Sequence, residues 1–253
     1  MTLVEETVCK GCGQKIKIFE MQIIGGPHKG ERVHLKYGCK CEDIRIAKES
    51  WEIHQRAKLQ TVKDYFERYS LINPRLMQAT LEGYQPKNDS QAEAKKMVEK
   101  YIQIFSRENP KNILFYGGFG VGKSHLAKVI TDGVMKKGYT TVFISVPKLL
   151  RKIRSTYNRD SQISEDDVFN VLESIDLLVL DDIGAEKRSD WTDERLFDVI
   201  DSRQGKSTIY TTNYTPDELL ELFGERNFSR IVNEDTVLIE IQGENHRLAD
   251  LEI

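Results

Sequence analysis

The chain has 253 residues, of which 39% are apolar and 30% charged, with only six prolines. This composition is typical of a globular protein and excludes disordered and collagen-like classes. Lysine and arginine total 37 and aspartate and glutamate 40, so the net charge of −3 excludes a uniformly basic coat for DNA or an anionic membrane. The sequence shows no membrane-length apolar run and no signal-peptide pattern at its start. We therefore expect a cytoplasmic protein with no membrane partner.

All four cysteines lie in the first 41 residues, as a C-x2-C pair and a C-x-C pair separated by 26 residues. In a reducing compartment, two such pairs are more typical of metal binding than of disulfides. Four thiolates can hold one tetrahedral Zn²⁺ and leave no open position, so the zinc would be structural. His28 and His34 are less favoured substitute ligands, and four reduced thiols are the alternative. The expected ligands are Cys9, Cys12, Cys39 and Cys41.

The residues between the cysteine pairs alternate loosely, which predicts two or three short strands around a Gly-Gly-Pro turn at 25–27. About 40 residues bury too little surface to be stable alone, and a bound metal offsets that deficit. We expect a zinc-binding domain at 1–45, a helical linker and lead-in at 46–91 and a nucleotide-binding domain at 92–253.

A helical pattern runs over 42–70, until Asn73-Pro74 interrupts it. Its apolar positions are Leu59, Val62, Phe66 and Tyr69. The polar residues 83–91 predict a loop before a helix from about Ala92 to Phe105.

A phosphate-binding loop is the strongest signal. The apolar run Asn112 to Tyr116 predicts a buried strand, and G-x-x-x-x-G-K-S and a helical segment follow it, which is the context this motif requires. Backbone N–H groups of the loop and the helix N-terminus favour phosphate, Lys123 reaches the β and γ phosphates, and Ser124 ligates Mg²⁺. The expected ATP-binding residues are Gly117, Gly118, Phe119, Gly120, Val121, Gly122, Lys123 and Ser124.

Residues 140–146 predict a second strand, and the apolar run 175–180 predicts a third that ends in Asp181 and Asp182. A buried parallel strand followed by an acid delivers a carboxylate to the carboxyl edge of the sheet, beside the phosphate loop. We expect Asp181 to hold Mg²⁺ through water and Asp182 to polarise the attacking water.

Residues 206–212 predict a fourth strand ending at Asn213, whose amide can hold the attacking water or contact the γ phosphate. Taken alone, an asparagine here is usually a turn residue. Arg226 and Arg230 share one face of a predicted helix, although such pairs more often form surface salt bridges.

Residues 146–159 carry five basic side chains and no acid, whereas 160–182 carry eight acids and no base. Basic side chains neutralise phosphates and an aromatic ring can stack on a base, so we expect single-stranded DNA to bind here. A solvated basic helix face is the alternative. The expected DNA-binding residues are Lys148, Arg151, Lys152, Arg154 and Tyr157.

Five motifs occur together in the order GGFGVGKSHLA, LLVLDDIGAEK, YTTN, GERNFSRI and GENHRL. In order and spacing they resemble those of AAA+ ATPases, and over roughly 75–248 the chain looks like the DnaC/DnaI group of bacterial and phage helicase loaders, to which the IstB transposition ATPases are closely similar. This resemblance implies an α/β P-loop AAA+ fold, a parallel sheet flanked by helices, joined here to a small N-terminal zinc-binding domain.

The resemblance also implies roles for single residues. Asn213 would be the sensor 1 residue. Arg230 would be the arginine finger that acts on the ATP of a neighbouring subunit, with Arg226 as the alternative. Arg247 would be a sensor 2-like arginine that acts in cis. The lead-in QATLEGY resembles the segment that closes over the adenine. Asp182 stands where many AAA+ proteins have glutamate, which predicts slow hydrolysis, and the sequence ends too soon after Arg247 for the usual helical lid.

The implied function is ATP-dependent loading of a DnaB-type replicative helicase. The N-terminal region would bind the helicase, and the AAA+ domain would bind single-stranded DNA and self-associate through the ATP site, with ATP, Mg²⁺ and Zn²⁺ as cofactors. The cysteine-rich head favours a loader over an IstB-like transposition helper, which generally lacks one. A third reading is an ATP-binding helicase clamp or inhibitor with little hydrolysis.

Overall fold

The computed structural model describes residues 1–51, 53, 57 and 74–246. The chain forms two compact units, Met1–Lys58 and Leu59–Ile253. The division into three parts at residues 45 and 91 stays a prediction. Within the described residues, no helix has the length and apolar character needed to cross a membrane.

The N-terminal unit contains an antiparallel sheet in the order β1-β2-β3. Its strands are β1 (Thr2–Val8), β2 (Lys15–Gln22) and β3 (Arg32–Tyr37). β2 and β3 flank the turn at 25–27, as expected. β1 was not expected, because all seven of its residues are exposed and its sequence has no alternating apolar face.

A helix begins at Cys41, the last cysteine, and runs over 41–51, and residues 53 and 57 are also helical. The start of the helix expected over 42–70 is therefore confirmed. The apolar positions that defined its remainder, from Leu59 to Tyr69, lie outside the described residues.

The second unit is built on a five-stranded, all-parallel sheet in the order β5-β6-β7-β4-β8. Its strands are β4 (Asn112–Tyr116), β5 (Thr141–Ser145), β6 (Leu177–Asp181), β7 (Ser207–Thr211) and β8 (Thr236–Glu240). All five residues of β6 and of β7 are buried, as expected for inner strands of a parallel sheet that is covered on both faces. β6 is mainly apolar, whereas β7 (STIYT) also buries serine and threonine side chains.

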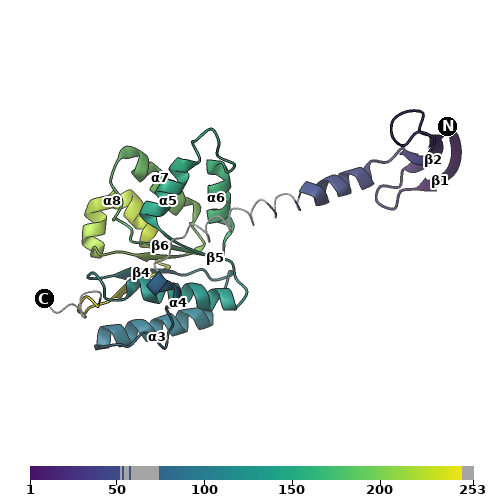
Figure 1. Cartoon of the computed structure of the whole chain (residues 1–253). Helices are drawn as coiled ribbons and strands as arrows, with labels where there is room; N and C mark the ends of the chain where they lie inside the picture. The colour runs from purple at the N-terminus through teal and green to yellow at the C-terminus, as the bar shows by residue number, and fades with distance from the viewer. Residues whose placement is uncertain (52, 54–56, 58–73, 247–253) are drawn as a thin grey trace. The chain divides into compact units, whose positions relative to one another are not determined.

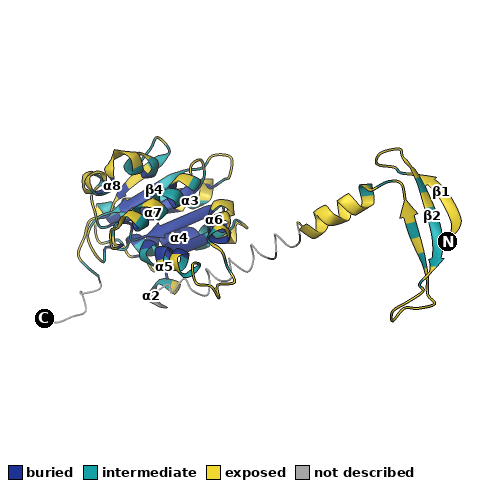
Figure 2. Cartoon of the chain, turned by 90° about the horizontal axis from the view of Figure 1, so that it is seen from above, coloured by how far each residue is buried: buried dark blue, intermediate teal, exposed yellow. Residues whose placement is uncertain are grey.

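Helices cover both faces of this sheet (Figure 1). One face carries α3 (Asp89–Ile104) and α4 (Lys123–Lys136), with the short α2 (Pro74–Met77) against α4. The other face carries α5 (Val146–Ser155), α6 (Glu165–Ser174), α7 (Asp190–Ser202) and α8 (Pro216–Ile231). Each face has its own buried apolar cluster, and the inner strands between them are mostly dark blue in Figure 2.

Two helices differ from their expected form. α3 begins at Asp89 rather than Ala92, because the Asn88 side chain accepts a hydrogen bond from the Gln91 N–H and caps the helix three residues earlier. α8 is interrupted at Gly224, whose φ of 73° is not helical. The residues that carry Arg226 and Arg230 therefore follow a kink.

The strand order indicates where along the edge of the sheet a ligand would bind. The chain leaves β4 for β5 at the far edge, returns through β6 and β7, and ends with β8 on the other side of β4. Open parallel sheets bind ligands beyond their carboxyl ends where the strand order reverses. Here that point lies between the loops that follow β4, β7 and β6.

Candidate nucleotide site and cysteine cluster

The loop after β4 passes close to two other segments. Gly122 is the N-cap of α4 with a φ of 105°, and a Cβ on it would lie 2.6 Å from the Tyr84 ring. Gly120 has a φ of 70°, and a Cβ on it would overlap the Asn245 side chain. Both positions require glycine for backbone conformation and for space. The motif glycines therefore fit a loop whose N–H groups face an anion at the start of α4.

Lys123, the first residue of α4, lies inside this loop and is only 5% exposed. Its Nζ donates hydrogen bonds to the Gly117 and Gly118 carbonyl oxygens at 2.8 and 2.5 Å, and to Asn213 Oδ1 at 2.8 Å. The structure thus brings the predicted phosphate-binding lysine and the predicted sensor 1 amide into contact. Charged phosphate oxygens are stronger acceptors than these neutral oxygens, so the ammonium can exchange them for phosphate.

The two predicted carboxylates follow the neighbouring strand. Asp181 is the last residue of β6 and is buried, and its Oδ1 accepts a 2.7 Å hydrogen bond from Thr211 Oγ1. Asp182 has a φ of 57° and is the one non-glycine residue with a positive φ in the described part of the chain. Its N–H donates to the same Thr211 oxygen at 2.9 Å. Strained backbone of this kind concentrates at functional sites.

The remaining loop residues differ in exposure. Ser124 is half-buried as the second residue of α4, and Val121 is buried. Phe119 is 67% exposed at the loop. A helix N-terminus, a buried lysine and two carboxylates at one sheet edge form a site for a polyphosphate with a divalent cation.

The lead-in packs against the phosphate loop. The Tyr84 hydroxyl donates to the Val121 carbonyl oxygen at 3.5 Å, its ring centroid lies 5.6 Å from that of His125, and burial raises the pKa of Tyr84 to about 12. The Thr80 carbonyl oxygen lies 2.8 Å from His125 Nε2. The expected closing segment thus lies next to the start of α4.

The arginine pair on α8 packs on α7. The Arg226 and Arg230 guanidinium groups lie 4.2 and 4.8 Å from the Phe197 ring centroid. Arg230 also pairs with Asp201, with 2.6 Å between Nε and Oδ1, and donates to the Arg226 carbonyl oxygen. Arg226 is exposed, whereas Arg230 is half-buried. In this structure Arg230 is held within its own chain.

Arg247, the predicted sensor 2 residue, lies outside the described residues. The two residues near it that can be described contact the phosphate loop, because Asn245 lies against Gly120 and the His246 N–H donates to the Gly120 carbonyl oxygen at 3.1 Å. The chain after β8 therefore reaches the nucleotide site.

The predicted DNA-binding residues lie on or just after α5. Arg151 is exposed, and Lys148 and Lys152 are half-buried. Arg154 lies with its guanidinium 4.4 Å from the Trp191 ring centroid. Tyr157 donates to Glu165 Oε1 at 2.9 Å and packs edge-on against the same indole. Arg154 and Tyr157 therefore have partners on α6 and α7.

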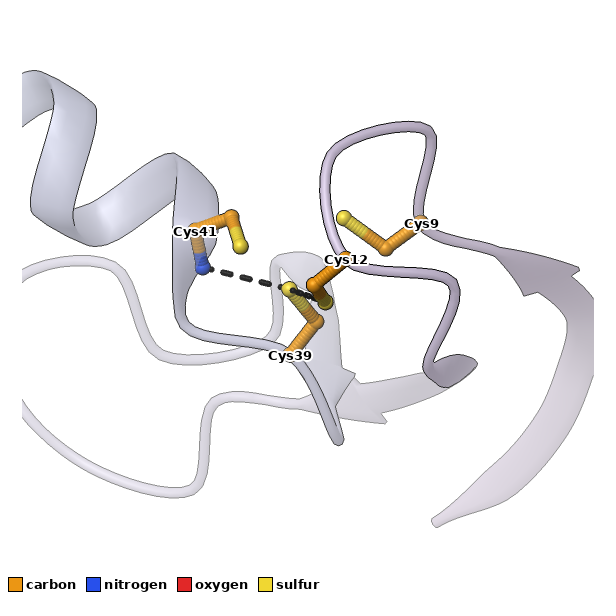
Figure 3. Close-up of side chains that lie close together, drawn as sticks. All are labelled: Cys9, Cys12, Cys39 and Cys41. Atoms are coloured by element: carbon orange, nitrogen blue, oxygen red, sulfur yellow. Dashed lines mark hydrogen bonds between the residues drawn. The ribbon is translucent and has the colours of Figure 1, made fainter.

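The four cysteines converge in the N-terminal unit (Figure 3). Their sulfur atoms all lie within 4.8 Å of one another, and 3.2 Å separates those of Cys12 and Cys39. With a Zn–S bond of about 2.3 Å, the sulfur atoms of a tetrahedral site lie about 3.8 Å apart, so this set is the right size. A hydrogen bond with Cys39, assisted by backbone N–H groups of Cys12 and Gly11, lowers the pKa of the Cys9 thiol to about 6. Despite a hydrogen bond from the Cys41 N–H, hydrogen bonds with the other cysteine side chains raise the pKa of Cys39 to about 12, and the pKa of Cys41 is raised as well. The cluster by itself therefore favours one thiolate, and a bound cation would favour ionisation of the others. A thiolate is the form that binds metal.

The predicted histidine substitutes are not part of this cluster. His28 faces Glu31 instead, with 3.1 Å between Nδ1 and Oε1. His34 pairs across the sheet with Glu20. Within the described residues, the group suited to a metal consists of the cysteines alone.

Sequence reasoning missed the residues that support the site from neighbouring elements. Thr211 was predicted only as part of a strand and of the YTTN motif, with no role of its own, although a hydroxyl at the buried end of β7 was a usable signal. Phe197, Asp201 and Trp191 carried no motif, because their contacts with the arginines and Tyr157 depend on how α5, α7 and α8 pack.

The fold and this site define an ATP-binding P-loop protein of the AAA+ type, which confirms the expected fold class. A solved structure of the DnaC helicase loader is 31% identical, with a TM-score of 0.60, over 67% of this chain and 99% of that one. The replicative helicase loader DnaC of Buchnera aphidicola subsp. Schizaphis graminum is 27% identical over 173 residues, which cover 68% of this chain and 70% of that protein. The replicative helicase loader DnaI of Bacillus subtilis is 30% identical over 151 residues, or 54% of this chain and 48% of DnaI.

The chain belongs to the family of IstB-like ATP-binding proteins, whose model matches residues 50–251. The resemblance expected from the five motifs is thereby confirmed. The match begins after Cys41, so the cysteine cluster lies outside the region that defines the family.

Proposed function

We propose that this chain is an ATP-dependent loader of a DnaB-type replicative helicase. The observation that carries the proposal is the convergence of Lys123, Asn213 and the Asp181-Asp182 pair at one sheet edge, in a chain whose relatives are named helicase loaders. The N-terminal unit with its zinc would bind the helicase, and the AAA+ unit would bind ATP, single-stranded DNA and further copies of itself.

The residues present fit Mg²⁺ and ATP. The amides at the start of α4 and Lys123 would bind the phosphates, while Ser124 and Asp181 would hold the metal. Asp182, fixed by its backbone, would orient the attacking water. Bound Mg²⁺ neutralises charge on the phosphates during transfer. Hydrolysis would be slow because the carboxylate of Asp182 reaches one methylene less far than that of a glutamate.

Self-association would complete the site with an arginine from the neighbouring copy. Arg230 remains the proposed finger and Arg226 the alternative. The ion pair with Asp201 keeps Arg230 bound within its own chain, and Arg226 is the more exposed of the two arginines. Release of Arg230 from Asp201 would therefore accompany its action on a neighbour. Arg247 would act in cis, from the segment that follows the Asn245 contact with the loop.

The experiment that tests this function is delivery of the organism's replicative helicase to a closed circle of single-stranded DNA. A circle has no end for a helicase ring to thread onto, so helicase bound to it reports loading. We expect the full chain with ATP to raise the amount of helicase on the circle several-fold, measured by capture of the circle.

Single-stranded DNA would bind along α5. Replacing Arg151 and Arg154 together with alanine is expected to weaken binding of an oligonucleotide by about tenfold at low salt, because two phosphate contacts are lost. The slope of log affinity against log salt should fall by roughly 1.4, the value for two released counterions on a single strand. Fluorescence anisotropy over a salt series measures both quantities.

The matched control is the double variant Lys96→Ala and Lys100→Ala. It removes the same charge from exposed positions of α3, on the opposite face of the sheet. We expect it to bind like the wild type. Equal losses in the two double variants would mean that net charge alone matters, and an unchanged affinity in the α5 variant would remove α5 as the DNA site.

A further inference from the structure

One hydroxyl group at the end of β7 forms hydrogen bonds with the end of β6 and with the turn that follows it. Thr211 Oγ1 lies 2.7 Å from Asp181 Oδ1 and 2.9 Å from the Asp182 nitrogen. Thr211 is fully buried, so this hydroxyl has no water to exchange with. One side chain thus contacts both Asp181 and Asp182, the two predicted carboxylates of the site.

The directions of these hydrogen bonds are fixed by chemistry. The Asp182 N–H can only donate, so the hydroxyl oxygen accepts from it. The single hydroxyl proton then goes to Asp181 Oδ1, since an ionised carboxylate only accepts. Thr211 therefore sets the orientation of the Asp181 carboxylate and anchors the backbone of Asp182 at the same time.

Further bonds hold the same turn. The Ile183 N–H donates to the Thr211 carbonyl oxygen at 2.8 Å, and Thr212 Oγ1 donates to the Ile183 carbonyl oxygen at 2.9 Å. The Ala185 N–H closes the turn onto the Asp182 carbonyl oxygen at 3.1 Å. A positive φ is unfavourable for aspartate, and persists where surrounding bonds over-determine it. Hydrogen bonds with Thr211 and Thr212 at the end of β7 therefore stabilise the positive φ of Asp182.

The same strand end carries Asn213, two residues beyond Thr211, and Asn213 contacts Lys123. A shift of β7 would therefore move Asp181, Asp182 and the Asn213 amide together. Supporting partners of metal ligands orient the ligands and change metal affinity when they are removed.

We propose that Thr211 is a positioning residue of the Mg²⁺-nucleotide site, which presents Asp181 to the metal and Asp182 to the attacking water. This inference rests on the proposed function, because it assigns Thr211 a role in the same site. Thr211 acts through the two acids and does not itself contact the reacting atoms.

The test compares Thr211→Val, which keeps the shape and removes the hydroxyl, with Thr211→Ser, which keeps the hydroxyl. Fluorescent ATP is titrated at increasing Mg²⁺ and in EDTA, and ATPase is measured under the same conditions. We expect Thr211→Val to need about 10- to 100-fold more Mg²⁺ and to lower kcat, with binding in EDTA unchanged. Thr211→Ser should return both values to within about twofold of the wild type.

The matched control is Thr208→Val. Thr208 is fully buried on the same strand, at the end opposite the site, where its hydroxyl bonds with Arg203 and Lys206. It should lose similar thermal stability while keeping the wild-type Mg²⁺ requirement. Thr211→Ala serves as a second hydroxyl-free variant if the valine variant does not fold.

Three results would overturn the inference. The first is a wild-type Mg²⁺ requirement in a folded, hydroxyl-free Thr211 variant, and the second is an equal shift in Thr208→Val. The third is failure of Thr211→Ser to restore the wild-type values. If the wild type itself showed no Mg²⁺-dependent nucleotide binding, the proposed function would fail, and the role of Thr211 with it.

Discussion

Lys123→Ala is expected to abolish measurable ATP binding and to lower the ATPase rate by on the order of a hundredfold or more. The lysine ammonium is buried within the phosphate loop, where it would meet the β and γ phosphates of bound ATP. Removing it also leaves Asn213 without its partner, so two groups of the proposed site are lost at once. Titration of a fluorescent ATP analogue and release of phosphate measure the two effects.

Lys136→Ala is the matched control for this change. Lys136 lies in the last turn of the same helix and is exposed, so the variant loses the same charge far from the loop. We expect wild-type binding and hydrolysis. If Lys123→Ala bound ATP as the wild type does while both variants stayed folded, the loop would not be the nucleotide site.

The double variant Cys12→Ser and Cys39→Ser is expected to lose zinc and to unfold residues 1–41. The three-stranded sheet buries little, since β1 is exposed throughout. Metal binding supplies on the order of 10 kcal/mol in structural zinc sites, more than such a sheet can supply by itself. Metal analysis of the purified full chain should find one zinc per wild-type chain and none in the variant. Hydrogen exchange should show loss of protection confined to the N-terminal peptides.

The controls separate metal loss from general damage. His28→Ala and His34→Ala should retain the zinc, because neither histidine belongs to the cysteine cluster. Peptides from 74–246 should keep their protection in every variant, since the two units are separately compact. A zinc-free wild type with a fully protected N-terminal sheet would contradict the zinc assignment.

The inner strands of the nucleotide-binding unit could be predicted within one or two residues. β4 and β6 are mostly buried and are largely continuous apolar runs, whereas β7 (STIYT) is buried but rich in β-branched and aromatic residues, and the motif residues mark where each strand ends. β1 and β8 lie at sheet edges, where exposure removes that signal. The early start of α3 at Asp89 depended on a single capping side chain.

The residues of the candidate site that belong to local sequence motifs could be predicted from the sequence. Lys123 and Asn213 lie 90 positions apart, yet the strands that precede them, β4 and β7, are neighbours, so their contact follows from the strand order. The supporting contacts could not be predicted, because they depend on how separate elements pack. The Asp201 partner of Arg230 depends on the packing of α7 against α8, and the Thr211 bridge depends on the register of β6 and β7.

The measurement that tests the central claim most directly is helicase delivery to the single-stranded circle with three forms of the chain. Wild type, Lys123→Ala and Lys136→Ala are each mixed with helicase, with and without ATP, and both captured helicase and unwinding of an annealed oligonucleotide are recorded. The account predicts ATP-dependent capture and unwinding with wild type and Lys136→Ala, and neither with Lys123→Ala. Helicase that is held by the chain but never unwinds would support the clamp reading, and the absence of any complex with the helicase would contradict the loader function.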